Sequence, residues 1–113
     1  IKRYIFPGSF IPSVHAILRS NLKESDLKLS HLEDMTPHYA RTLSIWRKKF
    51  LEKQDEIKNL GFDGEFIKLW DYYFSYCIGG FMERSIASMQ LVFSKPKCRN
   101  DISQSCQWQR RDV

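Results

Sequence analysis

The stretch from Thr36 to Phe50, TPHYARTLSIWRKKF, predicts a long amphipathic helix. Its apolar side chains recur at intervals of four, three and four residues on one face: Tyr39, Leu43, Trp46 and Phe50. Thr36 can cap the helix, and Pro37 suits the first turn because an amide hydrogen there would be unpaired anyway. We expect the helix to end at Leu60-Gly61, since glycine accepts the left-handed conformation common at helix ends.

A strongly aromatic helix is predicted next, from a cap at Asp63 to about Glu83. One continuous stripe is expected to be buried, and it consists of Phe66, Leu69, Trp70, Tyr73, Cys77 and Phe81. Tyr72 and Tyr76 fall on another face, where they would meet lipid, a partner or water. The two helices are therefore expected to supply most of the apolar core.

Shorter elements flank these helices. The N-terminal part reads as an extended Tyr4-Ile5-Phe6, a turn at Pro7-Gly8, and a helix from Pro12 to about Ser25. The apolar stripe of that helix is Val14, Ile17, Leu18 and Leu22. Strands are predicted at Leu27–Leu32 and Ser88–Ser94 from the alternation of apolar and polar residues. Two strands alone are marginal in water, so we expect them to extend a larger sheet.

Composition and charge narrow the class of protein. The 113 residues carry 18 basic and 13 acidic side chains, a net charge of +5. This excess suits anionic lipid headgroups, although a solvated helix face is the plainer interpretation. The basic clusters are short and lack an aromatic-basic motif, so no nucleic-acid partner is predicted. No stretch has the length of a membrane span or the pattern of a signal peptide, which favours a cytoplasmic protein.

Few residue types here have the spacing of a catalytic or metal site. The three cysteines, Cys77, Cys98 and Cys106, lack a paired spacing and are interpreted as structural thiols. The three histidines, His15, His31 and His38, are not spaced as metal ligands. Gly79-Gly80 has no preceding strand and no phosphate-loop pattern. Metal-binding residues are therefore not predicted.

Three motifs give the chain a recognisable likeness. They are Tyr4-Ile5-Phe6-Pro7-Gly8, then His38-Tyr39-Ala40-Arg41-Thr42-Leu43 with Trp46, and Trp70-Asp71-Tyr72-Tyr73-Phe74 with Cys77 and Phe81. Together they resemble the C-terminal part of the cyclopropane-fatty-acyl-phospholipid synthases, the mycolic acid cyclopropane synthase-like family. Leu60-Gly61-Phe62-Asp63 is similar to the plant members. The resemblance implies an α/β fold: the C-terminal portion of a Rossmann-like S-adenosylmethionine-dependent methyltransferase, with residues 1–97 in that domain and a loose polar tail over 98–113.

The resemblance also implies a reaction. Family members transfer a methyl group from S-adenosylmethionine to a cis double bond in a phospholipid acyl chain, and a bound bicarbonate ion takes the proton that is then lost. Tyr39 matches the tyrosine that contacts this ion, and it is the single catalytic residue we predict. A phenol suits the role because it stays protonated at neutral pH and can donate a hydrogen bond to an anion. From the residues alone, Tyr39 could instead merely begin the apolar stripe, with its hydroxyl in solvent.

Several functional parts of the family have no counterpart in this chain. The other ion ligands have no counterpart here, and the glycine-rich cofactor loop would lie upstream of residue 1, so no cofactor-binding residue is predicted. We expect the isolated chain to be inactive and to need an N-terminal methyltransferase half or another chain, working peripherally at a phospholipid membrane surface. The alternatives are a non-catalytic partner or lipid-surface binding module derived from the fold, and a truncated gene.

Overall fold

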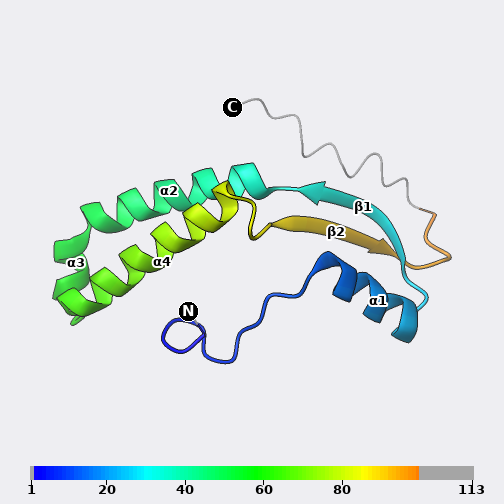
Figure 1. The fold of residues 1–113 in the computed structure, drawn as a ribbon, viewed down its shortest axis with the longest axis horizontal. Helices are drawn as coiled ribbons and strands as arrows, with labels where there is room; N and C mark the ends of the chain where they lie inside the picture. The colour runs from blue at the N-terminus through cyan, green and yellow to red at the C-terminus, as the bar shows by residue number, and fades with distance from the viewer. Residues whose placement is uncertain (1, 100–113) are drawn as a thin grey trace. The chain divides into compact units, whose positions relative to one another are not determined.

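The computed structural model describes residues 2–99 of the chain, which form four helices and two strands within that range (Figure 1). In chain order they are α1 (Val14–Glu24), β1 (Lys28–Asp34), α2 (Thr36–Glu52), α3 (Gln54–Asn59), α4 (Gly64–Met82) and β2 (Met89–Ser94). Contacts divide the chain into two compact units. Of the described residues, the first unit joins 2–7 to Glu33–Gln90, and the second joins Gly8–Leu32 to 91–99.

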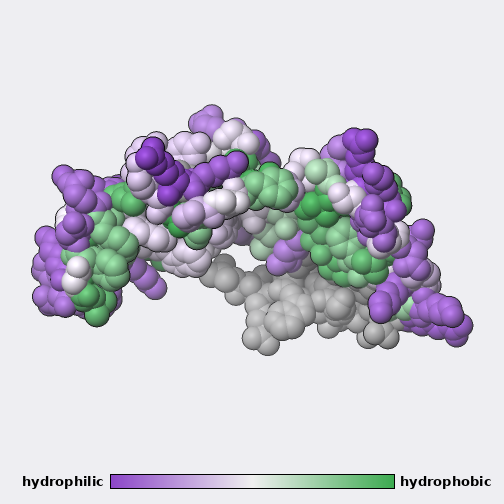
Figure 2. All heavy atoms as spheres, turned by 90° about the horizontal axis from the view of Figure 1, so that it is seen from below, coloured by the Kyte–Doolittle hydropathy of each residue, from purple (hydrophilic) through white to green (hydrophobic). Residues whose placement is uncertain are grey.

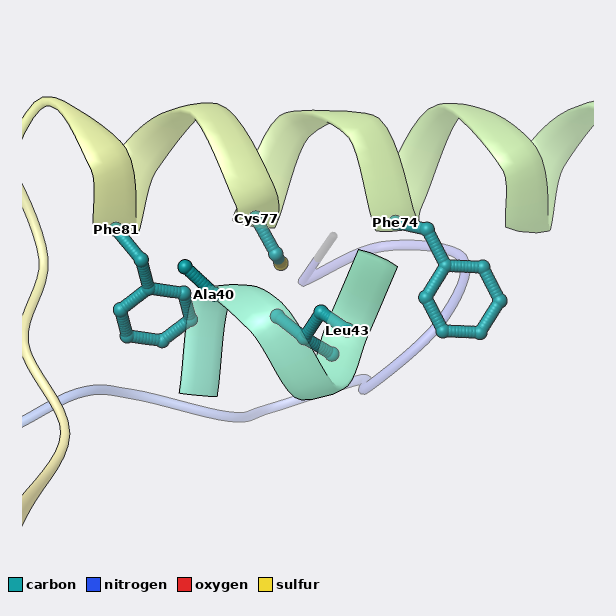
Figure 3. Packing of buried hydrophobic residues seen from close by; sticks show 5 residues of the cluster. All are labelled: Ala40, Leu43, Phe74, Cys77 and Phe81. Atoms are coloured by element: carbon teal, nitrogen blue, oxygen red, sulfur yellow. The ribbon is translucent and has the colours of Figure 1, made fainter. Parts of the chain in front are cut away.

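The core of the first unit lies between α2 and α4, which pack side by side (Figure 1). Ala40 and Leu43 of α2 point toward α4, whose Phe74, Cys77 and Phe81 point back (Figure 3). Leu43 is only 2% exposed, the most completely buried apolar side chain among the described residues. Six partly buried apolar residues surround this cluster: Tyr39, Phe50, Trp70, Tyr73, Ile78 and Ile86. The two predicted helices therefore form the main core, as the sequence indicates.

The start of α2 differs from the prediction. Met35, not Thr36, occupies the capping position, and Thr36 is the first helical residue. Thr36 is 2% exposed, and its hydroxyl oxygen accepts a hydrogen bond from the Ser88 amide at 3.2 Å. The Met35 amide donates to the Ser88 carbonyl at 2.8 Å. The threonine therefore ties the start of α2 to the segment that follows α4, which is a tertiary role that local sequence does not reveal.

The predicted helix from Thr36 to Leu60 is two helices. The Lys53 amide bonds to the Phe50 carbonyl, three residues back, and the Lys53 carbonyl accepts from Ile57 at the start of α3. Lys53 has φ −105° and ψ 25°, which depart from helical values, so α2 ends before it. Gly61, at φ 99°, follows α3 in the left-handed conformation and ends the helical region as predicted.

Helix α4 begins as predicted but buries a different stripe. The Asp63 carboxylate accepts a hydrogen bond from the Phe66 amide at 2.9 Å, which confirms the predicted cap. The buried residues of α4 are Ile67, Phe74, Cys77 and Phe81. Cys77 and Phe81 of the predicted stripe are thus confirmed, whereas its other members are only partly buried: Phe66, Leu69, Trp70 and Tyr73. The prediction omitted Ile67 and Phe74. The buried face of α4 is therefore rotated in part from the stripe that helical spacing predicted.

Two backbone hydrogen bonds from the residues after α4 to carbonyls in its last turn end the helix. The Arg84 amide donates to the Phe81 carbonyl at 3.2 Å, and the Ser85 amide to the Gly80 carbonyl at 3.0 Å. This pair defines a Schellman motif, in which the left-handed position is usually glycine. Here that position is Arg84, with φ 55°. Gly80 serves a different purpose, because a Cβ there would lie 3.0 Å from the Ile86 side chain.

Replacing Arg84 with glycine is expected to stabilise the chain by about 1 kcal/mol relative to the alanine variant. Both variants remove the guanidinium group, whereas only glycine removes the Cβ that is unfavourable at a positive φ. Urea unfolding of the two variants, followed by circular dichroism, measures the difference. Equal stabilities would mean that the left-handed backbone at this position carries no strain.

The second unit contains α1 and most of the strand pair. Ser13 caps α1 and accepts from the Ala16 amide at 3.1 Å, so Pro12 precedes the helix and does not occupy its first turn. Of the predicted stripe, Val14, Ile17 and Leu18 are partly buried, but Leu22 is 81% exposed. Asn21, and not Leu22, is the partly buried residue in this turn of α1. Its side-chain amide donates a hydrogen bond to the Leu27 carbonyl at 2.9 Å.

Strands β1 and β2 lie side by side and run in opposite directions (Figure 1). The alternation predicted for β2 is confirmed, with Met89, Leu91 and Phe93 less exposed than Gln90 and Val92. In β1, Leu29 and Leu32 stay exposed to solvent. Apolar side chains reach the surface (Figure 2), among them Leu60 after α3 in the first unit, and Leu22 of α1 and Leu29 of β1 in the second.

The segment predicted to be extended at Tyr4-Ile5-Phe6 forms turns. Gly8 follows it in the left-handed conformation at φ 76°, in line with the predicted Pro7-Gly8 turn. The Phe6 ring packs edge-on against Tyr73 of α4, with 5.8 Å between ring centroids. This contact holds the N-terminal residues against the first unit.

Candidate functional site

Tyr39, the predicted catalytic residue, lies in the first turns of α2 and is partly buried. Its ring packs edge-on against Phe81 of α4 at 5.0 Å and against Trp46, two turns along α2, at 6.5 Å. None of the residues that the structure describes hydrogen-bonds to the Tyr39 hydroxyl. The helix pair therefore fixes the ring from two sides and leaves the phenol able to donate.

Two backbone amides at the start of α2 are already engaged. The Thr36 amide donates to the Asp34 carboxylate at 2.9 Å, and the Tyr39 amide donates to the Met35 carbonyl at 2.9 Å. Hydrogen bonds from Thr36, from its hydroxyl and then its amide, lower the pKa of Asp34, and nearby Arg84 lowers it further. A carboxylate thus already occupies the anion-favouring helix start. The Thr36 and Tyr39 amides are therefore not available to an anion beside Tyr39, whose phenol can still donate.

Aromatic side chains form two sets of ring contacts in the first unit, one at Tyr39 and one at Tyr73, whose pKa the Tyr39 phenol helps to raise. We call these side chains together the aromatic flank, which comprises Phe6, Tyr39, Trp46, Trp70, Tyr73 and Phe81. Trp70 packs edge-on against Tyr73 at 5.4 Å, which continues the contacts away from Phe6. Trp46 and Phe6 remain about half exposed. The aromatic flank therefore offers an apolar wall beside one donor hydroxyl.

Tyr73 is a member of the aromatic flank that the sequence assigned only to the core. Burial raises the pKa of Tyr73 to about 12, and the neighbouring Cys77 thiol and Tyr39 phenol contribute in the same direction. Burial likewise raises the pKa of Cys77, although Tyr73 opposes that rise. Tyr73 and Cys77 therefore favour their protonated forms. No signal in the spacing of the residues identifies Tyr73 as a neighbour of Tyr39.

Alkaline pH is expected to destabilise the chain partly through Tyr73. A tyrosine whose folded pKa is about 12, above its ordinary value of 10.0, binds more protons folded than unfolded between those two values. Stability is then lost as pH rises through this window. Melting temperatures measured from pH 9 to 12 should fall less steeply in Tyr73→Phe than in the parent chain. Parallel curves would contradict the shifted pKa.

A groove of about 400 Å³ opens in the first unit, where α2 begins and α4 ends. We call it the arginine groove, and its lining residues are Thr36, Pro37, Ala40, Arg41, Ser44, Phe81, Met82 and Arg84. Arg41 follows Tyr39 by two residues, about 200° around the helix, so the groove and the aromatic flank occupy different sides of α2. Phe81 belongs to both. Sequence reasoning missed this groove because its two arginines come from distant parts of the chain.

Other candidate ligands do not gather. Within residues 2–99, no group of three His, Cys, Asp or Glu side chains is placed to hold a metal ion. Cys77 is buried and Cys98 is exposed, both as free thiols, while Cys106 and the predicted tail from 100 onward lie outside the described residues. None of the helices in the described part of the chain has the length and hydropathy of a membrane span.

Comparison with known proteins gives the site its context. The family model of mycolic acid cyclopropane synthetase matches residues 1–91. The chain is 38% identical to the tuberculostearic acid methyltransferase of Mycobacterium tuberculosis over 72% of this chain and 19% of that protein. It is 33% identical to the cyclopropane-fatty-acyl-phospholipid synthase of Escherichia coli K12 over 84% of this chain and 24% of that protein. A sphingolipid C9-methyltransferase of Komagataella phaffii is 24% identical over 84% of this chain and 19% of its own length.

The helices and the antiparallel strand pair are of the α/β class, as predicted, and the matches specify an S-adenosylmethionine-dependent methyltransferase fold. The chain belongs to the mycolic acid cyclopropane synthetase family. It spans about a fifth to a quarter of the length of the relatives it matches. The resemblance identified from Tyr39 and its neighbouring motifs is thereby confirmed at the level of the family.

Proposed function

We propose that this chain forms the lipid-facing portion of a methyltransferase that adds a methylene group to unsaturated phospholipid acyl chains. The observation that carries the proposal is the placement of Tyr39: a hydroxyl without a hydrogen-bond partner in residues 2–99, set in an apolar aromatic flank. The family and the names of its lipid methyltransferase members support it. An acyl chain needs such an apolar wall, and a reacting double bond needs few polar groups nearby.

The residues of the aromatic flank fit the chemistry of this reaction. Methyl transfer to a double bond leaves a carbocation, and aromatic faces stabilise cations electrostatically. Loss of a proton from the transferred methyl group then closes the ring. Bicarbonate, when bound, supplies the proton acceptor, and the Tyr39 phenol would hold it by donating a hydrogen bond without competing for its charge. Trp46 and Phe81 contact the Tyr39 ring edge-on and hold the phenol in place.

S-adenosylmethionine supplies the methyl group, but the described residues do not fit its binding. They contain no glycine-rich loop after a strand, and Gly79-Gly80 lies inside α4. The chain alone is therefore expected to bind unsaturated phospholipid without binding the cofactor or turning over. Calorimetric titration with S-adenosylmethionine and with a short-chain unsaturated phosphatidylglycerol separates these events. Cofactor binding at micromolar concentration, or turnover by the chain alone, would contradict the proposal that this chain binds the lipid and another part of the enzyme binds the cofactor.

A non-catalytic lipid-surface module is the second candidate, and the net charge of +5 together with the exposed apolar side chains favours it. In either case we propose a peripheral association with the cytoplasmic face of a phospholipid membrane. Electrostatic binding to anionic vesicles should weaken as salt is raised from 0.05 to 0.5 M, because the screening length shortens several-fold. Binding that does not respond to salt would exclude the electrostatic part of this association.

A further inference from the structure

We infer that the arginine groove binds the phosphate group of a phospholipid, with the glycerol end of the lipid over its apolar floor. This inference deepens the proposed function and rests on it. Two arginines, Arg41 from α2 and Arg84 from the turn after α4, line one groove of about 400 Å³. Nothing in the resemblance assigns either residue a role.

The cationic groups in the groove retain donors for a ligand. Arg84 contacts one carboxylate oxygen of Asp34 through Nη1 at 3.4 Å, and its side chain is 67% exposed. A guanidinium group has five N–H donors, so one long contact leaves most of them available. Arg41 makes no ion pair with any of residues 2–99. Arginine pairs well with phosphate because its planar fork can donate two parallel hydrogen bonds.

The other polar side chains that line the groove already make hydrogen bonds within the chain. The Thr36 hydroxyl accepts from the Ser88 amide, and the Ser44 hydroxyl donates to the Ala40 carbonyl at 3.0 Å. The groove therefore presents arginine as its only strongly polar chemistry within the described residues. Pro37, Ala40, Phe81 and Met82 make up the apolar lining, and Met82 is largely exposed. An anionic amphiphile matches this combination better than inorganic phosphate, which would gain nothing from the apolar lining.

Phe81 links the groove to the proposed reacting centre. Its ring lines the groove and also packs edge-on against Tyr39 at 5.0 Å between centroids. A phosphate in the groove and a double bond beside Tyr39 would thus lie on two sides of one aromatic ring. One phospholipid would then contact the groove through its phosphate and the aromatic flank through its acyl chain.

The backbone at Arg84 gives independent support. Its φ of 55° is a conformation that glycine adopts without cost, yet the position carries a large cationic side chain. Non-glycine residues in such conformations cluster at active sites and ligand clamps. Here the strained turn directs the start of the Arg84 side chain to the groove that Arg41 also lines.

The test is titration of the full chain with a short-chain phosphatidylglycerol below its micelle concentration. Arg41→Gln and Arg84→Gly should each weaken binding about fivefold, the effect of one cation near an anionic lipid. Lys48→Gln is the matched control, since Lys48 carries the same charge on α2, is absent from the groove lining and contacts Glu52. Binding to this control should be unchanged. Circular dichroism melts of each variant confirm folding, and Arg84→Gly should melt no lower than Arg84→Ala.

The outcomes separate the possibilities. Equal binding by the parent chain and both arginine variants overturns the inference, and so does an equal loss in Lys48→Gln, which would indicate general charge attraction. Inorganic phosphate that binds as tightly as the lipid would also overturn it, since the apolar floor would then contribute nothing. Lipid binding that depends on the arginines, in a reconstituted enzyme that transfers no methyl group, would support the phosphate site in the groove. The same result would contradict the proposed methyltransferase function.

Discussion

Replacing Tyr39 with phenylalanine is expected to slow methyl transfer roughly 100-fold, the typical effect of removing one donor to a charged group in an active site. The measurement uses a chimera in which this chain replaces the matching portion of the Escherichia coli synthase. The change removes only the hydroxyl, while the ring keeps its contacts with Phe81 and Trp46. The melting temperature should therefore stay close to that of the parent chimera.

Tyr72→Phe provides the matched control for this prediction. Tyr72 lies on the outer face of α4, is 63% exposed and stacks on Tyr76 away from Tyr39. The same chemical change there should leave the rate within about twofold, as expected of a surface substitution. Comparable rates in the two variants would show that the Tyr39 hydroxyl takes no part in the reaction.

Replacing Leu43 with alanine is expected to destabilise the chain by about 3 kcal/mol, within the range of 2–5 kcal/mol for buried leucines. Leu43 is 2% exposed and fills the centre of the cluster between α2 and α4 (Figure 3). Its removal leaves a cavity bordered by Phe74 and Cys77 that two packed helices can close only in part. Urea unfolding followed by circular dichroism gives the free energy of unfolding directly.

The control for Leu43 is the same substitution at Leu22 of α1. Leu22 is 81% exposed, so shortening it removes little buried surface and should change stability by less than about 0.5 kcal/mol. A loss at Leu43 no larger than at Leu22 would mean that the α2–α4 cluster is not the core of the first unit.

The sequence predicted the helices and strands well where local chemistry decides them. The Asp63 cap, the Gly61 stop and the alternation of β2 follow from residue type and period, and the structure has all three. It failed where a distant residue decides the outcome. Thr36 looks like a cap, but its hydroxyl accepts from Ser88, 52 residues further on. No glycine or proline marks the break at Lys53 either.

In the candidate site, too, local features were predicted from the sequence and tertiary contacts were missed. Tyr39 was identified from its motif, and its helix and apolar setting follow from periodicity. The neighbours that give it chemical context, Tyr73 and Phe81, approach only when α4 packs on α2 with Phe74 inward. Arg84 was missed because a left-handed turn at a non-glycine residue has no simple sequence signal. Helical period places residues on faces, but it does not determine which faces of two helices meet.

The most direct test of the central claim is methyl transfer by the chimera. The chimera, the chain alone and the isolated cofactor-binding half would each be incubated with unsaturated phospholipid vesicles and methyl-labelled S-adenosylmethionine, and labelled acyl chains would be measured by mass spectrometry. The account predicts that only the chimera adds one labelled CH2 unit to the unsaturated acyl chain. A chimera that folds and binds the cofactor but leaves the acyl chains unlabelled would contradict it.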